Sequence, residues 1–262
     1  MNTGERRQRI LELVQKSRSV TNEELLKEFE VTKETIRKDL NALAEKRHIV
    51  RTFGGAIVRD DYDPSFEQRL ISNLEEKRQI AKEAVGYIKP NDIIAFDSSS
   101  TTFELANLLS GDQELVVITN ALKVMNVLAK YNSITAICTG GILRSRSLSF
   151  QGEAAKNTIN TYNIDKAFVS AKALDFEKGI MDSNEGEADI KRLMLEKAKD
   201  VTMMVDHDKL THMAHVTVCP ASRINRIITS ALADAGILDK FRRAGIDVIV
   251  VPFQVQVSGG SI

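Results

Sequence analysis

The chain has 262 residues, of which 43% are hydrophobic and 27% are charged, and its formal net charge at pH 7 is zero. This composition is typical of a globular protein with a packed core, and it excludes binding of nucleic acid through overall positive charge alone. No apolar run approaches the roughly 20 residues that span a bilayer, and residues 1–9 lack the apolar segment of a signal peptide. Cys138 and Cys219 lie far apart without metal-binding spacing, so we expect free thiols in a cytoplasmic protein that uses no metal and no cofactor.

The charge is unevenly distributed along the chain. Residues 1–60 contain 13 Lys and Arg against 10 Asp and Glu, whereas the remainder contains 23 basic and 26 acidic residues. A mildly basic head on a mildly acidic body fits a head that meets a polyanion. On charge alone, chance unevenness explains the difference equally well.

The first sixty residues contain three segments with helical patterns. Residues 6–14 have apolar side chains at helical spacing. Thr21 and Glu24 have the spacing of a capping box, in which both side chains satisfy the first free amides of a helix. Thr32 has the position of a second N-cap. The helix that follows it repeats apolar residues at i, i+4 and i+7, namely Ile36, Leu40 and Leu43.

The second and third helical segments are joined by a short connection, which is typical of a helix-turn-helix motif whose second helix enters the major groove. Residues 46–58 then place two β-branched runs around a Gly-Gly turn, which predicts a hairpin, or wing, on the sugar-phosphate backbone. Arg37 can present two donors to a guanine or to a phosphate. The alternative is that Arg37 and Lys38 are merely solvated helix residues. The residues expected to contact DNA are Thr21, Thr32, Lys33, Thr35, Arg37, Lys38, Asn41, Lys46, Arg47 and Arg51.

The stretch from Arg6 to Leu40 resembles the DNA-binding signature of the DeoR family of sugar-catabolism regulators. That signature has an Arg, aliphatic residues at the fourth and eighth following positions, and, after a gap, a small residue and a run of the form T-aliphatic-R-basic-D-aliphatic. The matching residues are Arg6, Ile10, Val14, Thr32, Thr35, Ile36, Arg37, Lys38, Asp39 and Leu40. Asp39 is the one acid of the final run, and we expect it to pair with a neighbouring arginine. The resemblance implies a winged helix-turn-helix domain over residues 1–58.

Residues 59–73 are predicted to form a linker, because the periodicity stops there and Pro64 interrupts the segment. Similar Pro-x-Phe-x-x-Arg segments follow the wing in the DeoR family, which implies that the connector docks on the next domain. That domain is expected over residues 74–254, with a flexible tail at 255–262. Its strands are expected at 92–96, 115–119, 134–139, 166–170, 201–205, 226–229 and 247–251, and its helices at 74–87, 102–109, 121–129, 187–199 and 232–244. This alternation predicts an α/β fold with a mainly parallel sheet covered on both faces.

Ligands of parallel α/β sheets bind beyond the carboxyl ends of the strands, so the residues after each strand are the candidates for a binding site. The strongest candidate follows the first strand and directly precedes a helix. It comprises Asp97, Ser98, Ser99, Ser100, Thr101 and Thr102. Its hydroxyls, backbone amides and positive helix end can hold an anion such as phosphate, although no Walker sequence is present. The alternative is a helix cap with additional serines.

The resemblance to the DeoR family extends to about Val251 and implies a sensor domain similar in fold to ribose-phosphate isomerases and CoA transferases. On the family pattern, the turn at 97–102 holds the phosphate, and polar residues of the other strand ends line the rest of the site. Those residues are Thr119, Asn120, Gly140, Gly141, Lys172, Glu185 or Glu187, Asp206 and Lys209. The chain departs from the family in having serine instead of a frequent glycine in the first turn, and His207-Asp208 instead of two serines near the last site.

Together these patterns predict a DNA-binding repressor of a carbohydrate-catabolism operon that is relieved by a phosphorylated sugar and is not an enzyme. We expect a homodimer or homotetramer on a double-stranded operator, because one small head supplies too few contacts for operator affinity. One alternative is a sugar-phosphate isomerase-like enzyme with a DNA-binding head, in which Asp97 and Glu187 act as bases. Another is a nucleic-acid-binding scaffold that has no effector.

Overall fold

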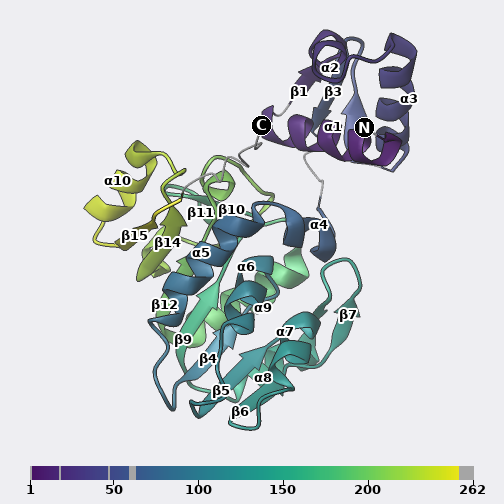
Figure 1. The fold of residues 1–262 in the computed structure, drawn as a ribbon. Helices are drawn as coiled ribbons and strands as arrows, with labels where there is room; N and C mark the ends of the chain where they lie inside the picture. Colours follow the sequence, from purple (N-terminus) through teal and green to yellow (C-terminus); the bar gives the residue numbers. More distant parts are fainter. Residues whose placement is uncertain (1, 18, 47, 59–62, 254–262) are drawn as a thin grey trace, which may run out of the picture. The chain divides into compact units, whose positions relative to one another are not determined.

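The chain divides into two compact units, residues 1–63 and 64–262 (Figure 1). A computed structural model describes residues 2–17, 19–46, 48–58 and 63–253. The expected linker at 59–73 is divided by this boundary, because from Pro64 onward its residues belong to the second unit and form α4 (Phe66–Ile71). Residues 59–62 and the expected tail at 255–262 lie outside the described residues.

The first unit contains three helices and a small antiparallel sheet, as expected of a winged helix-turn-helix. Its elements are α1 (Thr3–Ser17), β1 (Ser19–Thr21), α2 (Asn22–Phe29), α3 (Lys33–Glu45), β2 (Ile49–Arg51) and β3 (Gly55–Val58). The sheet has the order β1-β3-β2, so the predicted wing hairpin gains a third strand. A Cβ atom on Gly55 would lie 1.9 Å from the Val20 carbonyl oxygen, so only glycine allows β3 to approach β1 this closely.

Two predicted caps position the helices of this unit. The Thr21 side chain and Glu24 form the complete capping box at the start of α2. The Thr32 side chain accepts a hydrogen bond from the Thr35 amide at the start of α3. Ile36, Leu40 and Leu43 of α3 are buried in the core of the unit, which leaves the opposite side of the helix exposed.

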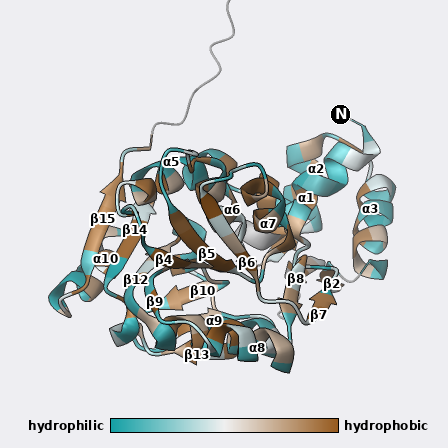
Figure 2. Ribbon diagram, turned by 90° about the horizontal axis from the view of Figure 1, so that it is seen from below, coloured by the Kyte–Doolittle hydropathy of each residue, from teal (hydrophilic) through white to brown (hydrophobic). Residues whose placement is uncertain are grey.

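The second unit is built on a seven-stranded parallel sheet of order β15-β14-β12-β9-β4-β5-β6. All seven strands coincide with predicted segments, to within a few residues at their ends. The strands are β4 (Ile93–Phe96), β5 (Leu115–Thr119), β6 (Ile134–Cys138), β9 (Ile164–Val169), β12 (Ala198–Met204), β14 (Arg226–Ser230) and β15 (Asp247–Val251). Hydrophobic residues are concentrated on these central strands (Figure 2).

Helices cover both faces of the sheet, which confirms the expected layered α/β architecture. One face packs against α5 (Leu74–Val85), α6 (Ser100–Asn107) and α7 (Leu122–Leu128). The other packs against α8 (Glu153–Asn160), α9 (Glu185–Lys197) and α10 (Ala235–Arg243). Within the described part of the chain, no helix is long and apolar enough to cross a membrane.

Several short elements of the second unit were not predicted. They are the hairpin β7 (Ile142–Arg144) and β8 (Ser149–Gln151), the helix α8, and the sheet of β10 (Ala173–Asp175), β11 (Gly179–Asp182) and β13 (Val216–Cys219). The predicted helix at 187–199 also ends earlier, at Lys197, because β12 begins at Ala198. Most of these strands have only three residues, which is too short for a periodic pattern to be recognised.

Candidate functional site

The turn between β4 and α6 lies at the carboxyl edge of the parallel sheet, in the middle of the strand order. Ser99 is the N-cap of α6, and its hydroxyl oxygen accepts a hydrogen bond of 3.0 Å from the Thr102 amide. All six residues from Asp97 to Thr102 are buried. The predicted segment is therefore a helix cap and also a group of hydroxyls and amides at a positive helix end.

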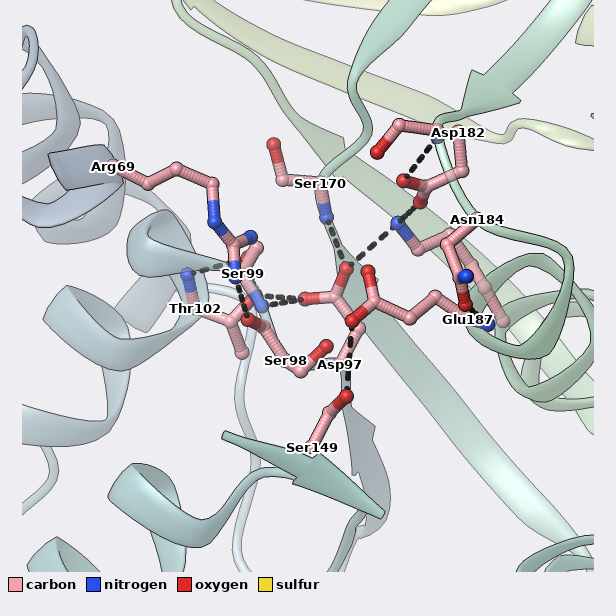
Figure 3. A network of polar contacts seen from close by, with 12 residues as sticks. Arg69, Asp97, Ser98, Ser99, Thr102, Ser149, Ser170, Asp182, Asn184 and Glu187 are labelled. Carbon is pink, nitrogen blue, oxygen red and sulfur yellow. Dashed lines mark hydrogen bonds and ion pairs between the residues drawn. The ribbon is translucent and has the colours of Figure 1, made fainter. Parts of the chain in front are cut away.

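The carboxylate of Asp97 is the centre of a network that shapes this turn (Figure 3). Its Oδ1 accepts hydrogen bonds from the Ser99 amide at 3.2 Å and the Thr102 hydroxyl at 2.7 Å. Its Oδ2 accepts from the Ser170 amide at 3.1 Å and lies 3.2 Å from Lys191 Nζ. Because both oxygens are engaged inside the protein, Asp97 holds the β4–α6 turn against the end of β9.

Lys191 is a buried cation between two carboxylates, and it was not among the predicted site residues. Its Nζ lies 2.6 Å from Asp182 Oδ2 as well as 3.2 Å from Asp97 Oδ2. Burial opposes its charge, but the two carboxylates outweigh this effect and raise the pKa of Lys191. Burial likewise acts to raise the pKa of Asp182, but the charge and hydrogen bond of Lys191 outweigh it and lower that pKa. Both groups are therefore charged at neutral pH.

Glu187 joins the same network from the first turn of α9, whereas Glu185 is exposed. The Ser149 hydroxyl donates to Glu187 Oε1 at 2.9 Å, and Arg144 Nη1 lies 3.5 Å from the same oxygen. Of the two glutamates expected at the site, only Glu187 thus contacts the hairpin β7–β8. The structure places Glu185 outside this network.

The ends of β5 and β6 are occupied largely by contacts within the protein. Thr119 Oγ1 accepts from the Ala121 amide at 3.1 Å, and Asn120 Nδ2 donates to the Phe150 carbonyl at 3.2 Å. Asn120 Oδ1 is buried and has no hydrogen-bond partner among the described residues. A Cβ atom on Gly141 would lie 2.4 Å from the Gln151 carbonyl oxygen. The space beside Gly141 is therefore filled by the backbone of β8 and is not open to a ligand. Next to Gly140, in contrast, a Cβ atom would meet nothing within 4 Å.

A second polar cluster surrounds Asp206 at the end of β12. Asn73 Nδ2 donates to Asp206 Oδ1 at 3.3 Å. Burial acts to raise the pKa of Asp206, but the charges of Lys209 and Lys77 outweigh it and lower that pKa. Burial lowers the pKa of Lys77 to about 8, although the charge of Asp206 acts in the opposite direction. Lys172 is half-buried, and its amide donates to the Met181 carbonyl at 3.1 Å.

Arg69 of α4 lies between the two clusters and was also missed by the residue predictions. Its Nη2 donates to the Ser98 carbonyl at 3.5 Å, and its charge influences both Lys77 and Asp182. Its Nε is buried and has no hydrogen-bond partner in the described part of the chain. Lys77 Nζ fixes the end of α4 by donating to the Arg69 carbonyl at 2.5 Å. The family's Pro-x-Phe-x-x-Arg segment was the signal that pointed to this helix.

Most of the residues expected to contact DNA lie on the exposed side of α3 and its flanks. Thr21, Thr32, Lys33, Arg37, Lys38 and Lys46 are exposed, and Thr35, Asn41 and Arg51 are half-buried. Arg47 lies outside the described residues. Arg37 and Lys38 are therefore accessible to a polyanion on this side of α3, where Arg37 is paired with Glu34.

Asp39 faces the interior of the first unit, as expected for an acid that does not face DNA phosphates. Its two oxygens lie 2.6 Å from Arg6 Nε and 2.7 Å from Arg7 Nε. The prediction of an arginine partner is therefore confirmed, and the partners come from α1 rather than from α3 itself.

The described residues contain no group of three His, Cys, Asp or Glu side chains that could hold a metal ion. Cys138 and Cys219 are both free thiols. Burial raises the pKa of the Cys219 thiol to about 11, so this thiol is uncharged at neutral pH.

Comparison with known proteins identifies both units. Residues 6–61 match a family model described as a DeoR-like helix-turn-helix domain, and residues 72–231 match the DeoR C-terminal sensor domain. The HTH-type transcriptional regulator YulB of Bacillus subtilis is 36% identical over 96% of this chain and 98% of its own length. The glycerol-3-phosphate regulon repressor of Escherichia coli K12 is 31% identical over 88% of this chain and 92% of its own length.

Among solved structures, ribose 5-phosphate isomerase A from Methanocaldococcus jannaschii matches 53% of this chain and 55% of its own chain, with 19% identity and a TM-score of 0.40. The family models cover most of the chain and follow the order of the two units. The chain therefore belongs to the DeoR family of transcriptional regulators, with a DNA-binding helix-turn-helix unit followed by a DeoR sensor domain.

Proposed function

We propose that this DeoR-family regulator represses an operon of carbohydrate metabolism and leaves its operator when a phosphorylated effector binds the second unit. The relative that represses a glycerol-3-phosphate regulon supports the repressor role and a phosphorylated metabolite. The observation that carries the proposal is the position of Arg69. Its guanidinium lies at the amino-terminal turn of α6, and its buried Nε has no partner among the described residues.

The chemistry of this turn suits a phosphate. The first amides of a helix have no partner inside the helix, and the helix dipole favours an anion beside them. Among the described residues, the amides of Ser100 and Thr101 have no hydrogen-bond acceptor. Arg69 of α4 contacts this turn through the Ser98 carbonyl. Its charge and that of Lys209, in the short helix η1 (His207–Leu210), both act on Lys77 of α5, so the three cations form one group. A dianionic phosphate would satisfy the free amides and offset these charges.

We propose binding without turnover, because Asp97, one of the two carboxylates that the isomerase hypothesis needs as bases, is engaged through both oxygens. Both oxygens of Asp97 are bound, one by Lys191 and the other by two hydroxyl or amide donors, whereas Ser149 and Arg144 both contact Glu187 through Oε1. A base that must take a proton from a substrate carbon needs a free oxygen. These contacts favour a structural role for Asp97 over the catalytic role that the isomerase hypothesis gives it.

In this proposal the protein acts in the cytoplasm as a homodimer or homotetramer on a double-stranded operator. Residues on the exposed side of α3 contact base edges, and Lys46 and Arg51 near the wing contact phosphates. One α3 helix and one wing supply few contacts, so two heads on paired half-sites are needed for operator affinity. The effector must bind the DNA-free conformation more tightly, because equal binding to both conformations would change nothing.

The proposal can be tested with the full-length protein bound to a fluorescent operator selected from random duplexes. We expect glycerol phosphate or a pentose or hexose phosphate to release the DNA, whereas the unphosphorylated compounds do not. Arg69→Ala is expected to raise the concentration of phosphorylated compound at half-release by about tenfold or more, since it removes a charge-assisted contact. The matched control is Arg242→Ala, an exposed arginine of α10. Release that is insensitive to the phosphate, or equal loss in both variants, would contradict the proposed site.

Effector binding is expected to weaken as the pH rises from 7 to 9. Burial lowers the pKa of Lys77 to about 8, so this cation loses its charge within that range. The phosphate is already dianionic above pH 7 and therefore contributes no opposing change. At pH 9 only about one Lys77 side chain in ten is still charged. The affinity of the wild type for the effector should therefore approach that of Lys77→Met at this pH. Titration calorimetry of Lys77→Met should give a flatter pH profile, and the exposed control Lys89→Met should retain the slope.

A further inference from the structure

Arg37 forms a two-point ion pair with Glu34 at the leading end of α3. Arg37 Nε donates to Glu34 Oε2 at 2.8 Å, and Nη2 donates to Oε1 at 2.7 Å. Both side chains remain more than half exposed, at 57% and 54%. The pair therefore lies on the surface of α3 that is available to DNA.

A carboxylate at this position opposes the attraction of DNA phosphates. Glu34 stands beside Lys33 and within one helical turn of Arg37 and Lys38. An acid in the first turn of a helix is favoured by the helix dipole, but the start of α3 is already capped by the uncharged side chain of Thr32. Neutralising Arg37 reduces the electrostatic, sequence-independent part of DNA binding. Glu34 therefore lowers the general affinity for DNA, although it favours the start of the helix.

The geometry of the pair leaves one edge of the guanidinium available. Glu34 occupies the edge formed by Nε and Nη2, and Nη1 has no hydrogen-bond partner among the described residues. The edge formed by Nη1 and Nη2 has the spacing that matches guanine O6 and N7 in the major groove. An arginine held on one edge loses less side-chain entropy when its other edge binds. It is also less able to turn toward a phosphate.

We propose that Glu34 determines base specificity by holding Arg37 so that its outer edge reads a guanine. This inference rests on the proposed role of α3 as the recognition helix. Glu34 is a positioning residue, and Arg37 makes the base contact. The hydrogen bond from Arg37 lowers the pKa of Glu34, so the carboxylate stays ionised at neutral pH. The pair would then contribute little to attraction by the phosphates of the DNA backbone and strongly to discrimination between bases.

The test uses the full-length protein, duplexes selected from a random pool by the wild type, and Glu34→Gln and Glu34→Ala variants. Glu45→Gln is the matched control, because Glu45 is an exposed acid on the same helix. For the wild type, 7-deazaguanine at one position of the half-site should weaken binding by roughly tenfold, since it removes the N7 acceptor. The Glu34 variants should lose most of that discrimination. They should also bind unrelated duplexes more tightly, with a salt dependence steeper by about one phosphate contact for each head.

The outcomes separate this inference from the proposal on which it rests. If Arg37→Ala binds the selected duplex as tightly as the wild type, α3 is not the recognition helix and both ideas fail. A second outcome is that Arg37→Ala loses binding while the Glu34 variants behave like the control Glu45→Gln, with the same effect of 7-deazaguanine and the same salt dependence. In that case α3 remains the recognition helix, and the role of Glu34 is refuted.

Discussion

Replacing Lys191 with methionine is expected to lower the free energy of unfolding of the second unit by about 3–5 kcal/mol at pH 7. The substitution keeps the length of the side chain but leaves Asp97 and Asp182 buried without the cation that both contact. A buried carboxylate that loses its partner carries the full cost of its desolvation. Urea unfolding followed by circular dichroism measures the loss. Lys178→Met, at an exposed lysine, should change the stability little.

The pH dependence of this loss distinguishes the ion pair from simple packing. In the wild type the pKa of Asp182 is lowered, so its stabilising contribution is present above the unfolded value of 3.8 and is lost as the pH falls through the folded value. In Lys191→Met burial still acts to raise the pKa of Asp182, and only the smaller effects of the Ser183 amide and the Arg69 charge oppose it, so we expect the sign of the shift to reverse. The variant should therefore gain stability relative to the wild type as the pH falls from 7 toward 4. A difference that does not change with pH would contradict the electrostatic explanation.

Asp97→Asn is expected to leave operator binding nearly unchanged while raising the effector concentration for release by about 30-fold. An asparagine has one acceptor oxygen, so it cannot hold both the Thr102 hydroxyl and the Ser170 amide as the carboxylate does. The amides at the start of α6 would then lose their arrangement toward a phosphate. Fluorescence anisotropy of operator-bound protein, titrated with the active phosphorylated compound, measures both quantities in one experiment.

The matched control for this substitution is Asp165→Asn. Asp165 lies near the start of β9, at the opposite edge of the sheet, and pairs with Lys199. Because it is also a partnered carboxylate, its loss tests whether a general weakening of the unit impairs release. If Asp97→Asn changes neither operator binding nor release, the effector site lies elsewhere in the molecule.

The sheet could be predicted because each of its seven strands is an apolar run between turn residues and helical segments. Leu115–Thr119 and Asp247–Val251 match their predicted bounds at both ends. β1, β7 and β8 have three residues each, and their pairing depends on partners rather than on a local pattern. Short strands of this kind are determined by tertiary packing, which a single sequence does not display.

Part of the candidate site could be predicted because it adjoins one of these apolar strands. The polar run at 97–102 follows a core strand directly, so its position pointed to the carboxyl edge of the sheet. Lys191 was missed because its carboxylate partners come from β11 and the end of β4, elements that only the folded chain brings together. One sign was present in the sequence: Lys191 lies on the core-facing stripe of α9 with Ala188 and Leu195, a position that a lysine rarely occupies without a partner.

The contact between Arg6 and Asp39 bears on how operator preference can diverge between relatives. Arg6 and Asp39, two positions of the DNA-binding signature, form a buried ion pair inside the first unit. Their identity is therefore determined by the packing of α1 against α3 and does not depend on the operator sequence. Exposed positions of α3 such as Lys33 and Glu34 are outside that constraint. If α3 is the recognition helix, as proposed, a descendant of this protein can acquire a different target sequence by changing those side chains alone, while its signature and its scaffold stay intact.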